Sequence, residues 1–364
     1  MGGFLDEKDF VIAAHDESTL LINAEFDCTR EIREYNQTGL CDSATKANGS
    51  GRRLAIEEPD PVRTCFEKDR DRILHSSAFR RLAGKTQVFV FPADHQRTRL
   101  THALEVAQVA RAIAGRLRLN IDLCEAIALG HDCGHGPGGH ASEDALSVFL
   151  DEGYDHAVIG ARHTLRSLNL CEETKNGIEN HSWSRPEPLT PEGLVVSWSD
   201  RIAYCAHDLE DALSANLIRI EDLPKSLRET IGTTRSEHLN YFINAVVSAA
   251  IATNKISMFE EAALQLATLR TFNYEYIYLR PESIHQSEQV IRVLRALTEF
   301  LIRHRDIAIE RTMVSDEQLF DDEDYIRSIV TYVGGMTDRY AFSMAVQLAG
   351  IPASDLPRGV DVLF

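Results

Sequence analysis

His102 is the first of several histidines and aspartates whose positions in this chain would allow them to hold a metal ion. It stands in line with Val106, Val109 and Ile113, so an expected helix over 101–118 turns its imidazole towards the apolar side. A histidine on such a face is more often a hydrogen-bonded core residue than a ligand. Taken alone, His102 therefore does not predict a metal site.

A second segment, at the end of an expected helix over 122–131, changes that interpretation. His131 falls on the apolar stripe of this helix and Asp132 follows it directly. The sequence GHGPGGH over 134–140 then ends the helix, because glycine and proline both disfavour its continuation. Each buried imidazole or carboxylate needs a partner, and one shared metal ion would satisfy several of them at once.

A third segment places acidic side chains along one face of an expected helix over 194–214. Asp200, Tyr204 and Asp208 follow one another at spacings of four residues, so they share a helix face. The ordinary interpretation is the solvated face of an amphipathic helix. This face has few long flexible side chains, however, and the stretch also contains Trp198, which favours a face turned towards a cavity.

The three segments together offer two imidazoles and two carboxylates as metal ligands, from His102, His131, Asp132 and Asp200. Mixed nitrogen and oxygen ligands suit divalent Mn, Mg, Ni, Fe or Zn and do not choose among them. Fewer than six protein ligands leave positions for water and a phosphate oxygen. This arrangement is typical of a catalytic metal site rather than a structural one.

Helices are the elements that must position these ligands, and the predicted fold class is all-α. Strand-like patterns are scarce, and only Val88–Phe91 looks extended. Apolar residues recur at helical spacing over 66–83, 101–118, 122–131, 142–150, 157–168, 194–214, 238–254, 258–274, 283–311, 322–333 and 337–349.

The chain is expected to divide into an N-terminal segment over 1–60, a catalytic core over 61–215 and a C-terminal helical region over 216–364 that packs on the core. Residues 41–60 are polar and lack periodicity, which indicates a flexible surface loop. A second loop is expected over 174–193, which contains three prolines and two glycines.

The composition narrows the classes of function. Fifty-six acidic residues against 38 basic ones give a net charge of −18, so stable binding to nucleic acid is not expected. The seven cysteines are scattered without a C-x-x-C motif, which argues against a disulfide framework and a thiolate zinc site. Neither a signal peptide pattern nor an apolar run of membrane-spanning length is present. A cytoplasmic protein without a membrane partner is therefore expected.

The sequence motifs around these ligands resemble those of the deoxyguanosine triphosphate triphosphohydrolase family, which belongs to the His–Asp (HD) superfamily of phosphohydrolases. The likeness covers roughly residues 60–345 and rests on separate motifs in the same order. These are DRDRILHSSAFRRL over 69–82, KTQVF over 85–89, RTRLTH over 97–102, GHDCGH over 130–135, DRIAY over 200–204 and GMTDRYA over 335–341.

The resemblance implies a helical enzyme that cleaves a deoxynucleoside triphosphate to deoxynucleoside and tripolyphosphate, by attack of a metal-activated water on the α-phosphorus. It implies that His102, His131, Asp132 and Asp200 hold the metal. His140, Glu143 and His135 match catalytic positions, with Glu143 orienting the ring of His140. The positions that match substrate contacts are His156, Arg99 and Arg201 at the phosphates, with Lys85 as a further charge, and Gln87, Tyr204 and Asp208 at the deoxyribose.

Several properties stay open in the sequence. The family usually has a bulky aromatic residue where this chain has Gly138, so the shape of the phosphate pocket is in question. The resemblance implies a homo-oligomer of unspecified size and leaves the preferred base and metal undetermined. An alternative is an HD phosphohydrolase of another nucleotide, such as a monophosphate, a cyclic nucleotide or hyperphosphorylated guanosine. A third is a non-catalytic nucleotide sensor or single-strand binder on the same scaffold.

Overall fold

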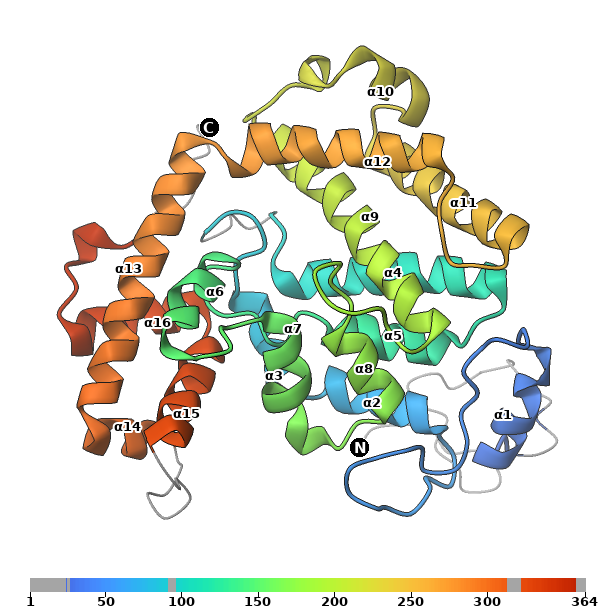
Figure 1. Ribbon diagram of the computed structural model, residues 1–364, viewed down its shortest axis with the longest axis horizontal. Coiled ribbons are helices and arrows are strands. Elements are labelled where there is room, and N and C mark those ends of the chain that lie inside the picture. Colours follow the sequence, from blue (N-terminus) through green and yellow to red (C-terminus); the bar gives the residue numbers. More distant parts are fainter. Residues whose placement is uncertain (1–23, 25–26, 91–95, 313–321, 358–364) are drawn as a thin grey trace, which may run out of the picture.

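The computed structural model of the chain describes residue 24 and residues 27–90, 96–312 and 322–357, with helices numbered α1 to α16 (Figure 1). Within those residues the one β pairing is an isolated antiparallel bridge between Thr86 and Thr98. The predicted all-α fold class is therefore confirmed. The same part of the chain contains no helix that is both long enough and apolar enough to cross a membrane.

The helices range from 4 residues in α7 to 24 residues in α9. Single π-helical turns at Gly160–Thr164 and Tyr274–Tyr278 continue α7 and α12. The bounds are α1 Arg30–Asn36, α2 Cys65–Leu74, α3 Ser77–Arg81, α4 Arg99–Leu117, α5 Ile121–Gly130, α6 Ala141–Leu146, α7 His156–Ile159, α8 Glu172–Glu179, α9 Pro191–Ser214, α10 Lys225–Ile231, α11 Arg235–Thr253, α12 Glu260–Asn273, α13 Pro281–Arg303, α14 Arg305–Thr312, α15 Asp322–Gly334 and α16 Asp338–Ala349.

Capping residues explain where two of the important helices begin. Thr190 caps α9 by accepting a hydrogen bond from the backbone of Gly193, and Pro191 fills the first turn, where its missing N–H is not needed. Asn120 caps α5 by accepting from the backbone of Leu123. These two helices contain the third and second candidate segments, so the caps help to fix which side chains face inwards.

The predicted loop over 174–193 is wrong in its first part, because α8 occupies Glu172–Glu179. Gly177 is compatible with this helix, since a side chain there would collide with Ile127 of α5. Gly130 of α5 meets Ile178 of α8 in the same way. The glycines therefore allow α5 and α8 to approach closely rather than breaking the chain into a loop.

Other boundaries also differ from the sequence pattern. The helix expected over 66–83 is divided between α2 and α3, and the one over 283–311 is interrupted at His304 between α13 and α14. The helices expected over 142–150 and 157–168 end early, and their second halves form short 3₁₀ and π turns. Val88–Val90 form bends rather than a strand, and Phe91 lies outside the described residues. The pattern missed α1 and α10.

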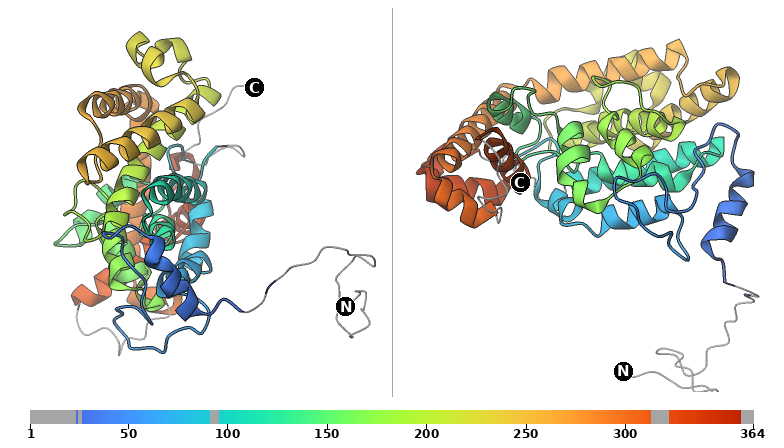
Figure 2. Two further views of the ribbon diagram at one scale, coloured as in Figure 1. Left: turned by 90° about the vertical axis from the view of Figure 1, so that its right-hand side faces the viewer. Right: turned by 60° about the horizontal axis from the view of Figure 1, so that its bottom comes forward.

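Two apolar cores organise the helices. At the centre α4 and α5 lie side by side and α9 crosses them, and Val109, Ile127 and Ile202 contribute fully buried side chains there (Figure 1). A second core joins α6 to α13, α15 and α16 around Leu146 and Leu297. Figure 2 shows α13 to α16 gathered at one end of the molecule. The domain boundaries expected from the sequence stay a prediction.

Two buried charged residues connect the C-terminal helices to the centre. Asp338, the first residue of α16, accepts hydrogen bonds from the backbone and hydroxyl of Thr86 and from the backbone of Gly138, at 2.6 to 3.0 Å. Lys85 donates to the backbone carbonyls of His135 and Gly334. These contacts hold both segments that flank the candidate ligands.

The irregular stretch 41–60 is fastened to the core at specific points. Arg53 forms a buried ion pair with Asp69 and donates to three backbone carbonyls. Thr45 donates to Glu192 through both its backbone and its hydroxyl. The expected lack of regular structure is therefore found, together with a set of polar anchors that periodicity does not indicate.

Candidate active site

A cavity of about 380 Å³ lies among α4, α9, the 134–140 loop and the junction of α12 with α13. Three of the site residues expected from the sequence are not on its walls: His131 and Glu143 lie just behind them, and Lys85 is directed elsewhere. The expected residues on its walls are Gln87, Arg99, His102, Asp132, His135, His140, His156, Asp200, Arg201, Tyr204 and Asp208.

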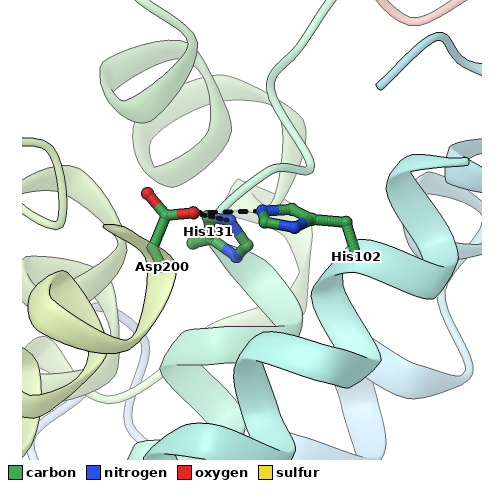
Figure 3. A group of neighbouring side chains, drawn as sticks. All are labelled: His102, His131 and Asp200. Atoms are coloured by element: carbon green, nitrogen blue, oxygen red, sulfur yellow. Dashed lines mark hydrogen bonds and ion pairs between the residues drawn. The ribbon is translucent and has the colours of Figure 1, made fainter. Parts of the chain in front are cut away.

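Three of the expected metal ligands converge from three helices. His102 projects from α4, His131 from the end of α5 and Asp200 from α9, and their side chains point towards one another (Figure 3). Nε2 of His102 lies 3.0 Å from Oδ1 of Asp200, and Nε2 of His131 lies 3.7 Å from the same oxygen. One ligand atom from each residue therefore fits around a single cation.

The ring of His131 is held in the form that a metal requires. Its Nδ1 lies 2.6 Å from the carbonyl oxygen of Ala128, and because a carbonyl only accepts, Nδ1 carries the proton. Nε2 then presents a lone pair, and among the described residues it has no hydrogen-bond partner although the side chain is 1% exposed. A buried acceptor without a donor fits a cation at this point.

Asp132, the fourth expected ligand, stands beside His131, and its ligand oxygen lies within 4.8 Å of ligand atoms of His131 and His181 rather than of the whole group formed by the other three expected ligands. Its Oδ1 lies 3.4 Å from Nε2 of His131 and 3.2 Å from Nε2 of His135, and Oδ2 accepts from Arg99 at 2.7 Å. Burial alone would raise the pKa of Asp132, but Arg99 and the two histidines lower it well below its ordinary value. The carboxylate is therefore ionised and able to bind a cation.

His140, expected to be catalytic, and His156, expected at the phosphates, share one carboxylate. Glu143 accepts from Nδ1 of His156 in a short contact and from the backbone of the same residue, whereas Nδ1 of His140 lies 3.6 Å away. His140 precedes α6 and its side chain is 75% exposed, while His156 is buried. The closest partner of Glu143 is thus His156, and His140 sits at the mouth of the cavity.

The sequence analysis did not identify His181, which the structure places in the cavity wall beside His131. The two rings meet edge to face with centroids 4.9 Å apart. Nδ1 of His181 lies 2.8 Å from the carbonyl of Ile178, three residues earlier, as Nδ1 of His131 does with Ala128. The signal for His181 would have been a helix ending in a histidine, and the expected loop over 174–193 concealed it.

The opposite end of the cavity is aromatic and internally hydrogen-bonded. The hydroxyl of Tyr278 donates to Asp208, and Nε of Arg270 donates to the hydroxyl of Tyr204 at 3.0 Å. Burial raises the pKa of Asp208 to about 7 despite the tyrosine donor. Arg270 and Tyr278 come from α12 and its π-helical continuation, and the resemblance did not include them.

Arg201 and Gln87 are both expected to contact the substrate. They differ in whether their polar groups already have a partner within the chain. The guanidinium of Arg201 lies 3.7 Å above the ring of Trp183, a distance typical of a cation–π contact. Oε1 of Gln87 is buried and has no hydrogen-bond partner among the described residues. Gln87 therefore faces the cavity with an acceptor that a ligand could use.

Lys85 does not reach the cavity, so the expectation that it offsets the charge of a triphosphate is wrong. Its ammonium group is buried and directed to the carbonyls of His135 and Gly334. Burial, aided by the nearby Arg81, lowers the pKa of Lys85 to about 7. The residue supports the 134–140 loop from behind.

Gly138 replaces the usual aromatic residue for a steric reason. Its φ of +75° lies in the left-handed region, which side chains disfavour. A Cβ atom at this position would lie 2.4 Å from Cγ1 of Val290, a fully buried residue of α13. The volume that an aromatic side chain would need is thus filled by α13.

Comparison with known proteins agrees with this site. Residues 99–205 match the model of the HD domain, and residues 256–347 match that of a phosphohydrolase-associated domain. A deoxyguanosinetriphosphate triphosphohydrolase-like protein of Caldanaerobacter subterraneus subsp. tengcongensis is 41% identical over 320 residues, covering 86% of this chain and 93% of the relative. Proteins of the same description from Clostridium perfringens and Clostridium tetani are 37% and 33% identical, covering 85% of this chain and 94% and 93% of the relatives.

The matched HD region begins at the first residue of α4 and ends within α9, so it spans all four expected metal ligands. Relatives at these identities align with most of this chain and with nearly all of their own length. The chain therefore belongs to the deoxyguanosinetriphosphate triphosphohydrolase-like family of HD-domain phosphohydrolases.

Proposed function

We propose that this protein hydrolyses deoxynucleoside triphosphates, dGTP among them, to deoxynucleoside and tripolyphosphate. The proposal rests on the convergence of His102, His131 and Asp200 beside a cavity of about 380 Å³, a size within the usual range for small ligands. The description of the relatives, which names deoxyguanosine triphosphate, supports this substrate class.

His102, His131, Asp132 and Asp200 are the residues that would hold a divalent cation, and their nitrogen and oxygen atoms suit Mn, Mg, Ni, Fe or Zn. Such a cation supplies a water of lowered pKa and polarises a phosphate oxygen. Arg99 keeps Asp132 ionised and oriented through its 2.7 Å contact. The protein thereby presents an anionic ligand in a buried place where an unpaired carboxylate would otherwise be unfavourable.

The leaving 5′-oxygen needs a proton when its bond to the α-phosphorus breaks and the bond from water forms. His140 is placed to give that proton, because it lies at the cavity wall and is open to solvent for reprotonation. Glu143, 3.6 Å from Nδ1 of His140, orients the ring. Its stronger contact with His156 fixes the position of the carboxylate.

The remaining expected residues position the nucleotide. Arg201 and His156 lie on the part of the wall that faces the phosphates in this arrangement. Gln87, Tyr204 and Asp208 line the cavity, and by the family resemblance we assign them to the deoxyribose, with the 3′-hydroxyl bound and a 2′-hydroxyl excluded.

A panel of the four deoxynucleoside triphosphates, each with Mn²⁺ and with Mg²⁺, tests the proposal when the released phosphates are separated by ion-exchange chromatography. We expect tripolyphosphate from at least one deoxynucleotide and little from GTP. Release of pyrophosphate or inorganic phosphate, or no release at all, would contradict the substrate assignment and favour another nucleotide.

The homo-oligomeric state and the cytoplasmic location are parts of the same proposal that rest on the sequence alone. Analytical ultracentrifugation with and without nucleotide measures the first of them. A sedimentation coefficient of a monomer under both conditions would contradict a stable homo-oligomer.

A further inference from the structure

A tryptophan covers one of the arginines in the cavity wall. The guanidinium carbon of Arg201 lies 3.7 Å from the centroid of the Trp183 ring, and both residues line the cavity. Trp183 nevertheless remains 49% exposed, although a large aromatic side chain gains free energy by burial. Core packing therefore does not explain why an indole stands at this place.

Arg201 differs from Arg99 and Arg270, which also line the cavity. Arg99 donates to the carboxylate of Asp132, and Arg270 donates to the hydroxyl of Tyr204. Among the described residues no group accepts a hydrogen bond from Arg201, and its Nε is buried without a partner. The charge and the donors of Arg201 are therefore available to an anionic ligand.

The contact with Trp183 preserves this availability. The N–H donors of a guanidinium lie in its plane, so a ring that stacks on its face occupies none of them. A carboxylate partner would instead take up two donors and offset the positive charge. An aromatic face is thus a partner that fixes the orientation of an arginine and leaves its donors to a phosphate.

The indole is itself held in position. The rings of Trp183 and Trp198 meet edge to face, with centroids 4.8 Å apart and an interplanar angle of 78°. Trp198 precedes Arg201 by three residues in α9, so the two side chains lie on the same side of that helix. The hydroxyls of Ser182 and Ser184, on either side of Trp183, are hydrogen-bonded at 3.0 Å. The stack therefore has support from both segments that form it.

We propose that Trp183 is a positioning residue for the phosphate chain of the substrate, acting through Arg201. Its indole holds the plane of the guanidinium in the cavity wall while the donors in that plane bind phosphate oxygens. The inference rests on the proposed function, in which Arg201 contacts the phosphates. It adds a residue that neither the sequence motifs nor the proposed reaction includes.

Isothermal titration calorimetry of the full chain with Mg²⁺ present tests this role, with inorganic tripolyphosphate and deoxyguanosine as separate ligands. Trp183→Leu keeps an apolar side chain but removes the aromatic face. We expect its dissociation constant for tripolyphosphate to rise roughly three- to thirty-fold, the range of cation–π contacts, while that for deoxyguanosine stays at the wild-type value. Trp183→Phe, which keeps an aromatic face, should retain most of the affinity for tripolyphosphate.

A double-mutant cycle shows whether Trp183 acts through Arg201. In an Arg201→Gln background, Trp183→Leu should cause no further loss of tripolyphosphate affinity, because the group that the indole orients is gone. Leu189→Ala is the matched control, since Leu189 is 70% exposed in the same connection between α8 and α9 and lies outside the cavity wall. This control should bind both ligands as the wild type does.

An unchanged affinity of Trp183→Leu for tripolyphosphate would overturn the inference and leave the proposed function intact. An equal loss of affinity for both ligands, or a loss that persists in the Arg201→Gln background, would also overturn it. Circular dichroism spectra establish folding, and Trp183→Gln decides by the same criteria if Trp183→Leu is unfolded. A wild-type protein that neither binds tripolyphosphate nor releases it from any deoxynucleotide would instead refute the proposed function itself.

Discussion

The two ends of the cavity satisfy their polar groups in opposite ways. At the cation end, formed by His102, His131, Asp132 and Asp200, the ring of His131 is anchored from behind and its Nε2 faces the other ligands without a hydrogen-bond partner among the described residues. At the aromatic end, formed by Tyr204, Asp208, Arg270 and Tyr278, side chains bind one another. The cation end is therefore arranged to bind an ion, whereas the aromatic end must exchange internal contacts for contacts with its ligand.

Asp200→Ala should produce the largest effect, because it removes a carboxylate that the proposed cation needs. Turnover should fall to the background rate, and the bound Mn²⁺ should fall with it, as measured by activity assays and equilibrium dialysis. Glu229→Ala, which removes an exposed acidic group of α10, is the control and should change neither value. Retention of both metal and activity in Asp200→Ala would break the distinction between the two ends.

His140→Ala should act on the chemistry without acting on the cation. We expect turnover to fall by roughly 10²- to 10⁴-fold, the range typical of a general acid or base. The Mn²⁺ content should stay at the wild-type level, because His140 lies in neither three-residue group that includes His131. If metal and activity disappeared together, His140 would have to be reassigned as a ligand.

Tyr278→Phe should have a smaller effect, since it removes one hydroxyl donor from the aromatic end. In the complex we expect this hydroxyl to exchange Asp208 for the ligand. Loss of that hydrogen bond, roughly 1.4 kcal/mol, corresponds to about a ten-fold rise in KM, with kcat changed much less. Tyr276→Phe, in the same π-helical turn but outside the cavity wall, is the matched control. An equal change in both variants would show that the effect is not specific to the cavity.

The smallest effect concerns stability and pH. Burial raises the pKa of Asp208 from 3.8 to about 7, so in this window the folded protein binds a proton that the unfolded chain has released. The free energy of unfolding should therefore fall as the pH rises, by up to about 1.4 kcal/mol per pH unit. Asp208→Asn lacks this dependence, and its stability relative to wild type should grow between about pH 4 and about pH 7 and then level off.

Urea unfolding of both proteins across that pH range measures the difference. A constant difference would mean that Asp208 titrates normally and that the aromatic end is wetter than its burial indicates. Such a result would weaken the contrast between the two ends without touching the assignment of the cation ligands.

Helical periodicity was enough to predict the fold class and the inward direction of His102 and His131, because both depend on local spacing. The same reasoning predicted that Asp200 faces a cavity, and the structure places it in the cavity wall. The motifs of the family resemblance then supplied residues that periodicity alone could not distinguish, such as Gln87.

The sequence could not indicate features that depend on contacts between distant segments. Gly177 contributed to the wrong prediction of a loop, because its actual role, the close approach of α5 and α8, depends on a contact between distant segments. The predicted loop also concealed His181, which follows the end of α8. Lys85 looked like a phosphate ligand because its charge is visible in the sequence and its burial is not. The family resemblance paired Glu143 with His140, whereas His156, 13 residues away, is its closer partner.

The contacts of Asp338 connect helix α16, near the C-terminus, to the backbone beside the candidate active site. This carboxylate holds the backbone on both sides of the cavity, at Thr86 next to Gln87 and at Gly138 next to the catalytic turn, while it is itself the first residue of α16. Any tilt of α16 would move the two flanks together. The C-terminal helices are thus coupled to the catalytic site. A neighbouring subunit or an effector that displaced α16 would change turnover without contacting the nucleotide.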